Sequence, residues 1–337
     1  WTLDVGHGDF DNDGWEDIYL ACDYGTDRIY FNNRDGSFTE TTEKSLGGFD
    51  TKKGMNVEVA DYDNDGLLDI YVTNITDEYM KECNMLWHNN GDRTFTDVSQ
   101  ETGTCATLWG WSAKFADFDN DGLLDLFVTN GLRSAGEENY IPVVTKMIIT
   151  PGIDFTELSN WPDIGNRSWS GYQKKKFYQN LGAGAFREMS KEAGVDNDLD
   201  GRGLGIADFN NDGRLDIVQT NADQPALLYR GDTENAGNWV QLRLQGSGSN
   251  TDAIGARVTL RAGGIRQIRE VDGGNGYSGQ SMLRLHFGIG AATAADSVEI
   301  RWPDGQKESV SAPVNRVTVV RQPRTALVTR AASGRER

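Results

Sequence analysis

The sequence predicts an all-β protein in which a β-propeller of repeated blades precedes a small β-sandwich or barrel domain. A nine-residue acidic loop occurs four times, and short runs rich in β-branched and aromatic residues flank each copy. Forty glycines against seven prolines supply many tight turns. Self-similarity at a fixed period indicates a repeat architecture, and short strands joined by glycine-containing turns are typical of propellers.

Each repeat carries the parts of one propeller blade. A short strand precedes the loop, as in MNVEVADY and WSAKFADF, and an apolar strand follows it, as in LDIYVTN and LDLFVTN. A third run follows in every repeat (RIYFNN, NMLWHNN, KKFYQN and ALLYRG), and in the first three repeats a glycine-containing turn leads to a fourth run. Because four short antiparallel strands make one blade, we predict four blades, the last without an evident fourth strand.

The loops read DFDNDGWED, DYDNDGLLD, DFDNDGLLD and DFNNDGRLD, and they begin at residues 9, 61, 117 and 208. Side chains at positions 1, 3 and 5 converge when the chain turns at the glycine in position 6. A backbone carbonyl at position 7 adds a ligand, and the aspartate at position 9 closes the shell. Such a cage of hard oxygens suits Ca²⁺, whereas Mg²⁺ demands octahedral geometry and keeps its waters. The predicted side-chain ligands are Asp9, Asp11, Asp13, Asp17, Asp61, Asp63, Asp65, Asp69, Asp117, Asp119, Asp121, Asp125, Asp208, Asn210, Asp212 and Asp216, and the predicted carbonyl ligands are those of Trp15, Leu67, Leu123 and Arg214.

Two other interpretations of the loop fit less well. An EF-hand needs glutamate at position 12, where these copies have Leu20, Val72, Val128 and Gln219. A plain polar β-turn also uses Asp, Asn and Gly, but it does not require aspartate at positions 1, 5 and 9 in four copies. We therefore expect about four calcium sites, with the fourth the weakest because Asn210 replaces a carboxylate.

These repeats resemble the FG-GAP/VCBS family, whose calcium-loop propeller repeats also occur in the head of integrin α chains. The resemblance covers residues 1–231. It implies that each loop lies between the first two strands of its blade and that the loop positions given above hold calcium. Propellers of this type usually carry about seven blades, within the general range of about four to eight. We expect the four repeats not to close a ring alone, and to be completed by further blades, by strand exchange with the C-terminal region or by a neighbouring chain.

Residues 238–320 form a different block. The runs NWV, AIGARV, HFGIG and WPDG occur in this order, and alternating apolar and polar residues predict six or seven strands. The block resembles the ASPIC/UnbV domain, which typically follows FG-GAP/VCBS repeats, as in acidic secreted cartilage proteins. The resemblance implies an architecture rather than a molecular activity. Residues 321–337 form a basic tail, which we expect to dock on an acidic surface.

An insertion at about residues 131–172 separates the second and third strands of the third blade, and it holds Trp161, Trp169, Tyr140 and Tyr172. Long insertions in compact repeats are often functional loops. These aromatic residues either cap the propeller or form a recognition surface for a glycan or a protein. The sequence leaves both open.

Several functional classes fit poorly. A formal net charge of −18 argues against nucleic-acid binding, and no run approaches the roughly 20 apolar residues that span a bilayer. Three cysteines and three histidines have no zinc-site spacing. We interpret His286 as a structural histidine, Arg269 and Glu270 as separate surface or turn contacts, and the glycine-rich run after Asp272 as no phosphate loop.

The function that the sequence favours is a secreted or cell-surface (alternatively periplasmic) calcium-binding scaffold for adhesion or extracellular assembly, with a protein or polysaccharide ligand or a neighbouring chain as partner. The alternative is an enzyme or accessory protein of a biosynthetic pathway, and the absence of a nucleophile–base pair counts against it. A secreted protein permits a bridge between Cys83 and Cys105, which would leave Cys22 as a buried thiol.

Overall fold

The computed structural model describes residues 1–154 and 156–324. It is nearly all β, and three four-stranded antiparallel sheets follow one another along the chain. A fourth sheet has three strands. The first sheet consists of β1 (Thr2–Gly8), β2 (Asp17–Cys22), β3 (Arg28–Asn32) and β4 (Phe38–Glu40), and the second of β5 (Asn56–Ala60), β6 (Asp69–Thr73), β9 (Met85–Asn89) and β10 (Phe95–Asp97). The third consists of β11 (Gly110–Ala116), β12 (Asp125–Asn130), β13 (Lys176–Asn180) and β14 (Phe186–Glu188), and the fourth of β15 (Gly201–Ala207), β16 (Asp216–Asn221) and β17 (Gln224–Tyr229).

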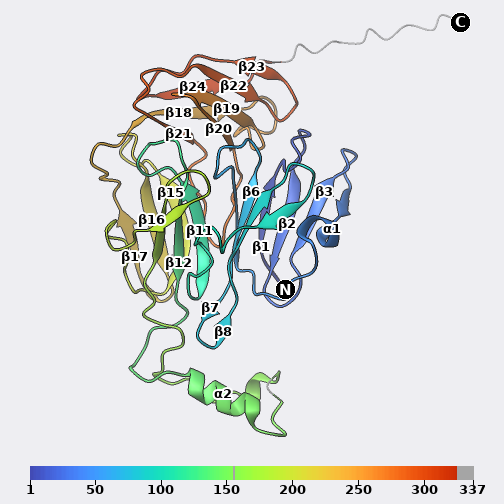
Figure 1. Ribbon diagram of the computed structural model, residues 1–337, viewed down its shortest axis with the longest axis vertical. Helices are drawn as coiled ribbons and strands as arrows, with labels where there is room; N and C mark the ends of the chain where they lie inside the picture. The colour runs from blue at the N-terminus through green and yellow to red at the C-terminus, as the bar shows by residue number, and fades with distance from the viewer. Residues whose placement is uncertain (155, 325–337) are drawn as a thin grey trace, which may run out of the picture.

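The sheets stand side by side as propeller blades (Figure 1). Strands β6 and β12 are buried along their whole length because the second and third blades each pack between two neighbouring blades. Tyr19 and Ile70 belong to the cluster between the first two blades, and Tyr71 and Leu126 to the next. Within the described part of the chain, no hydrophobic cluster joins the fourth blade to the first. The four blades therefore form an open arc.

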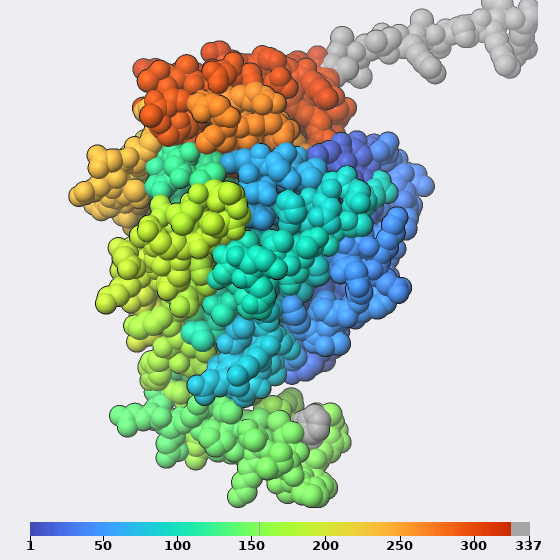
Figure 2. Space-filling model, in the orientation of Figure 1, coloured from blue at the N-terminus to red at the C-terminus, as the bar shows by residue number. Residues whose placement is uncertain are grey.

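The C-terminal region forms two sheets that enclose a separate core containing Phe287 and Trp302. In one sheet β18 pairs with β21 and, in parallel, with β24. Figures 1 and 2 show this domain covering one end of the blades. Its strands are β18 (Asn238–Gln245), β19 (Arg257–Ala262), β20 (Ile265–Glu270), β21 (Leu285–Gly290), β22 (Ser297–Arg301), β23 (Lys307–Ser309) and β24 (Val317–Arg321).

The insertion of the third blade lies at the end of the molecule opposite the C-terminal domain (Figure 1). It contains α2 (Ile141–Ile149) and a 3-10 turn (Leu158–Asn160), which the sequence analysis did not predict. Proline is tolerated in the first turn of a helix, so Pro142 does not prevent α2. Other short elements are α1 (Thr42–Leu46) and a small hairpin of β7 (Thr76–Asp77) and β8 (Met80–Lys81).

The insertion has a small core of its own. Tyr140 is buried there, and the rings of Trp161 and Trp169 stack with their centroids 6.0 Å apart. Most of the exposed apolar residues of the insertion are instead aliphatic, such as Ile149 at 72% and Leu158 at 81%, and of the four aromatic residues named above Tyr172 is the exposed one, at 53%. Two of the tryptophans thus hold the insertion together, and its exposed apolar surface is mostly aliphatic.

The cysteines are arranged as the sequence analysis proposed. Cys83 and Cys105 form a disulfide with their Cα atoms 4.8 Å apart, and Cys22 is buried and free. In the described residues, no helix is long and apolar enough to cross a membrane. Most of the basic tail, including Arg330, Arg335 and Arg337, lies outside the described residues, so its docking stays a prediction.

Candidate calcium loops

Each acidic loop connects the first two strands of its blade at the end covered by the C-terminal domain (Figure 1). The four loops turn in the same way. Asparagine at position 4 has a positive φ in every copy, for example 59° at Asn12 and 61° at Asn120, and the following glycine at position 6 also has a positive φ. Asparagine and glycine adopt this left-handed conformation at the lowest cost. The repeated Asn-Asp-Gly run thus sets the backbone that gathers the carboxylates.

In the first three loops the aspartates at positions 1, 3 and 5 converge. One carboxylate oxygen from each lies within 4.8 Å of the other two in the set of Asp9, Asp11 and Asp13, and the second and third loops repeat this arrangement. Backbone amides hold position 1, since Asp9 accepts hydrogen bonds from Asp13 and Gly14 at 2.8 and 2.9 Å. Three converging carboxylates are the ligand set that Ca²⁺ prefers.

The aspartate at position 9 does more than the sequence analysis assigned to it. Asp17 accepts hydrogen bonds from the backbone amides of Phe10 at 3.0 Å and Asn32 at 2.8 Å. Asp216 makes the equivalent bonds to Phe209 and Gly231. This aspartate therefore ties its loop to the third strand of the blade, in addition to standing beside the cage.

The residues predicted to offer carbonyl ligands lie in the expected turn. The backbone amides of Trp15, Leu67, Leu123 and Arg214 each donate to the position 5 carboxylate of their own loop, at 2.9, 2.7, 2.7 and 2.9 Å. This bond orients the position 5 side chain. That their carbonyls bind the cation stays a prediction.

Burial makes the charge of these carboxylates costly. Burial, together with the charges of neighbouring aspartates, raises the pKa of Asp17 to about 8 and the pKa of Asp61, Asp69 and Asp117 to about 7. Oδ1 of Asp61 is buried and has no hydrogen-bond partner. A buried acceptor without a partner is unfavourable, so a divalent cation fits this position in the second loop.

The fourth loop differs. The amide of Asn210 donates to Asp212 at 2.9 Å, and the guanidinium of Arg214 binds the same carboxylate at 2.6 Å. Burial alone would raise the pKa of Asp212, but the bond from Arg214 opposes it, and the pKa lies below its usual value. Asp13 of the first loop pairs with Arg34 at 2.7 Å in the same way, so the feature that sets the fourth loop apart is the amide of Asn210 at position 3, and its weaker calcium binding stays a prediction.

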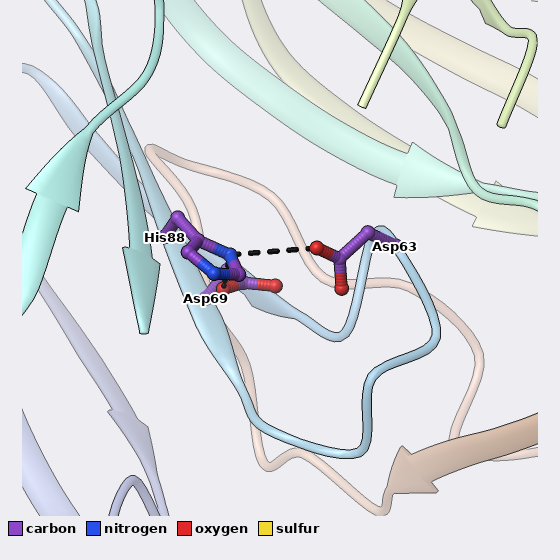
Figure 3. Close-up of side chains that lie close together, drawn as sticks. All are labelled: Asp63, Asp69 and His88. Carbon is purple, nitrogen blue, oxygen red and sulfur yellow. Dashed lines mark ion pairs between the residues drawn. The ribbon is translucent and has the colours of Figure 1, made fainter. Parts of the chain in front are cut away.

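His88 stands next to the second cage and was missed by the sequence analysis. It lies on β9, and Nδ1 is 3.4 Å from Asp63 Oδ2 and 3.4 Å from Asp69 Oδ1 (Figure 3). Interaction with Asp69 raises the pKa of His88 to about 9. Aligning the third runs of the repeats, NMLWHNN with KKFYQN, would have shown that His88 replaces Gln179, which donates to Asp119 in the third loop at 3.0 Å.

The C-terminal domain rests directly on the loops. Arg301 Nη1 lies 2.7 Å from Asp9 Oδ2 in the first loop, and His286 Nε2 lies 2.7 Å from Asn120 Oδ1 in the third. In the fourth loop, Gln241 donates to Asp208 at 3.0 Å. The guanidinium of Arg266 packs against Gly66 in the second loop so closely that a Cβ there would clash with it. Every loop therefore contacts the C-terminal domain.

This interface corrects the expectation for Arg269 and Glu270. Arg269 lies over the ring of Phe287, with its charge near Asp61, so it faces the blades. Glu270 pairs with Arg257 at 2.7 Å. The two residues do make separate contacts within the C-terminal domain, but both face the blades rather than solvent, since the charge of Arg269 acts on Asp61 and Arg257, the partner of Glu270, also donates to the Asp9 carbonyl.

The glycine-rich run after Asp272 also has a role that the sequence analysis did not assign. Asn275 accepts a hydrogen bond from His7 of β1, Tyr277 donates to Asn56 of β5, and the Met282 amide donates to the Ile206 carbonyl of β15 at 2.9 Å. The segment therefore lies along the inner strands of the arc. Glycine allows the close approach, since at Gly279 the segment lies against backbone atoms of Leu204 in β15.

Comparison with known proteins agrees with this architecture. The sequence profile of the FG-GAP-like repeat matches residues 9–72 and 76–128, and that of ASPIC and UnbV matches residues 246–327. The chain combines FG-GAP-like repeats with an ASPIC and UnbV domain. Neither profile names an enzyme family.

Three relatives share both regions of this FG-GAP and ASPIC/UnbV chain. Cartilage acidic protein 1 of Homo sapiens is 26% identical over 317 residues, which cover 91% of this chain and 42% of the relative. The proteins of the same name in Mus musculus and Xenopus tropicalis are both 27% identical, over 302 and 310 residues, with 88% and 90% of this chain covered. The chain thus spans about two fifths of the length of these relatives.

Proposed function

We propose that the chain is a secreted, calcium-binding propeller scaffold in which loaded loops fix the ASPIC and UnbV domain on the blades. The observation that carries the proposal is the coincidence of two features at one surface. The loops gather three carboxylates each in the first three blades, and the C-terminal domain contacts every loop at that end. Calcium would supply the charge and rigidity that such a surface needs.

An extracellular location is supported by two observations. The relatives carry the name cartilage acidic protein 1. The chain also contains the Cys83–Cys105 disulfide, and disulfides persist in oxidising compartments.

The ligand of the scaffold is proposed to be a protein or a polysaccharide, or a neighbouring chain that completes the arc. The insertion supports the first choice, because Ile148, Ile149 and Leu158 are exposed at the end away from the C-terminal domain. Exposed apolar residues that lie together often mark interaction sites. The open ends of the arc support the second choice, since Leu228 on the last strand β17 is 67% exposed.

Calorimetric titration of the chelated chain with Ca²⁺ tests the proposal. We expect three stronger sites and one weaker site, with dissociation constants as high as about 10⁻⁴–10⁻³ M, as in other extracellular modules. Asp117→Asn should remove one stronger site. Asp232→Asn is a suitable control because Asp232 is an exposed carboxylate outside the loops. Equal calcium uptake by the wild-type chain and a variant lacking all three position 1 carboxylates would contradict the proposal.

A further inference from the structure

The second loop is the one loop of the described chain in which a histidine nitrogen is grouped with the carboxylates of the cage. The equivalent third-strand positions hold Phe31, Gln179 and Arg230 in the other blades. Phe31 has no ligand atom, Gln179 offers an amide, and Arg230 carries a positive charge. His88 alone offers a nitrogen that can bind a metal ion.

The geometry of His88 fits metal ligation better than hydrogen bonding. Hydrogen bonds between N–H and oxygen span about 2.7–3.2 Å, whereas Nδ1 lies 3.4 Å from both Asp63 Oδ2 and Asp69 Oδ1. Around a tetrahedral metal ion with metal–ligand distances of about 2.1 Å, two ligand atoms lie about 3.4 Å from each other. The three ligand atoms all lie within 4.8 Å of one another. They form one face of a site for a small divalent ion (Figure 3).

Two buried atoms without hydrogen-bond partners point to a missing ligand here. Nδ1 of His88 is buried and has no hydrogen-bond partner, and the same holds for Oδ1 of Asp61, whose residue is 1% exposed. Asp61 belongs to the same acidic loop, where its carboxylate lies within 4.8 Å of Asp63 and Asp65. In the first and third loops, by contrast, both oxygens of the position 1 aspartate accept backbone hydrogen bonds.

We propose that the second loop is a mixed nitrogen–oxygen site that binds a first-row divalent transition ion such as Zn²⁺ through His88, Asp63 and Asp69. Imidazole favours such ions, while Ca²⁺ selects oxygen ligands. Binding exchanges the imidazole proton for the metal ion, as at other histidine sites. Because Asp63 and Asp69 both belong to the two ligand sets, the loop holds one cation at a time, and Zn²⁺ displaces Ca²⁺ from this loop.

The inference rests on the proposed function, since it assigns a different preference to one of the calcium loops. The chain supplies its own matched variants. His88→Gln gives the second loop the residue of the third, and Gln179→His gives the third loop the residue of the second. The calcium-loaded wild type and both variants are dialysed against Zn²⁺, and bound zinc and calcium are measured per chain by elemental analysis.

Wild type should take up one Zn²⁺ and release one Ca²⁺. Its affinity for Zn²⁺ should be at least about tenfold above that of His88→Gln, because loss of even a group that only orients a metal ligand lowers metal affinity by about tenfold or more. Gln179→His should take up a second Zn²⁺. Equal zinc uptake by wild type and His88→Gln would overturn the inference even if all four loops bind calcium. Zinc uptake that depends on His88 in a chain without bound calcium would uphold this site and contradict the calcium proposal instead.

Discussion

Arg301 of the C-terminal domain lies 2.7 Å from Asp9, the first carboxylate of the first acidic loop. The adjacent Arg257 donates to the backbone carbonyl of the same aspartate at 2.9 Å. The domain that ends the chain therefore binds the side chain and the backbone of a loop near its beginning. Such contacts require the loop to keep its shape.

We predict that removing calcium loosens this docking. Two unit charges 4.8 Å apart repel by about 3.5 kcal/mol at an effective dielectric constant of 20. Three converging carboxylates make three such pairs in a loop, and in the first loop the arginines that pair with Asp13 and Asp9 offset part of this repulsion. At the third loop the contact with His286 is neutral: burial lowers the pKa of His286 to about 3, so it meets Asn120 as an uncharged ring.

Hydrogen exchange with and without a chelator measures this effect. Amides of β21 and of the segment around Asn275 should exchange faster without calcium, while those of β6 in the blade core should change less. Unchanged protection of β21 after complete calcium removal would show that the domain docks independently of the cation.

Single loop variants should differ in a definite order. Asp65→Ala removes a carboxylate from a cage of three, whereas Asn210→Ala changes a loop whose position 5 aspartate already pairs with Arg214 at 2.6 Å. A site at a hundredfold excess over its dissociation constant contributes about 2.7 kcal/mol to stability. At high Ca²⁺ we expect Asp65→Ala to lose up to that amount, and Asn210→Ala less. Chemical unfolding in calcium buffer gives both values, and the reverse order would contradict this picture.

Much of the fold follows from local sequence, and the interface does not. The Asn-Asp-Gly turns and the apolar strands after them repeat in the sequence, so the blades and the convergence of Asp9, Asp11 and Asp13 could be predicted from single repeats. The pairing of Cys83 with Cys105 also lies within one repeat. The contact of Arg301 with Asp9 joins residues nearly 300 positions apart, and no local pattern encodes it.

Two of the residues whose roles local reasoning missed share a physical cause. Arg269 and Asn275 lie in segments whose surroundings are set by the packing of one domain on another. His88 was missed for a different reason, because its partners come from the preceding loop of the same blade and no short motif spans them. Comparison between equivalent positions of the repeats identifies it, since three blades have other residues there.

Stability should rise with pH above neutrality because of Lys175. Its ammonium is fully buried, and it donates to Asn130 O and Oδ1 and to the Gln173 carbonyl at 2.7–2.9 Å. Burial is the main cause that lowers the pKa of Lys175, to about 7. The charge of Asp200 favours a higher pKa and the charge of Arg202 favours a lower one. The unfolded chain, with a lysine pKa of about 10.4, then binds more protons than the folded chain between pH 7 and pH 10.

Under these conditions the free energy of unfolding increases with pH, by at most about 1.4 kcal/mol per pH unit from this group. Lys175→Met removes the titration, so the stability difference between wild type and variant should shift in favour of wild type from pH 7 to pH 9. Denaturant unfolding in calcium buffer at several pH values measures it. Parallel pH curves for the two proteins would show that the lysine titrates normally.

The glycine-rich segment along the inner strands should not tolerate even a methyl group at Gly279. A Cβ there would lie 2.0 Å from the Leu204 carbonyl oxygen and 3.0 Å from its backbone carbon, and backbone atoms of β15 cannot move as a side chain can. Gly279→Ala should therefore cost about 1–3 kcal/mol, as overpacking does elsewhere. Gly273→Ala is the matched control, because its Cβ would meet only the flexible side chain of Ile254, at 3.2 Å. Thermal unfolding of both variants compares them, and an equal melting temperature would mean that the segment does not hold this position against β15 in solution.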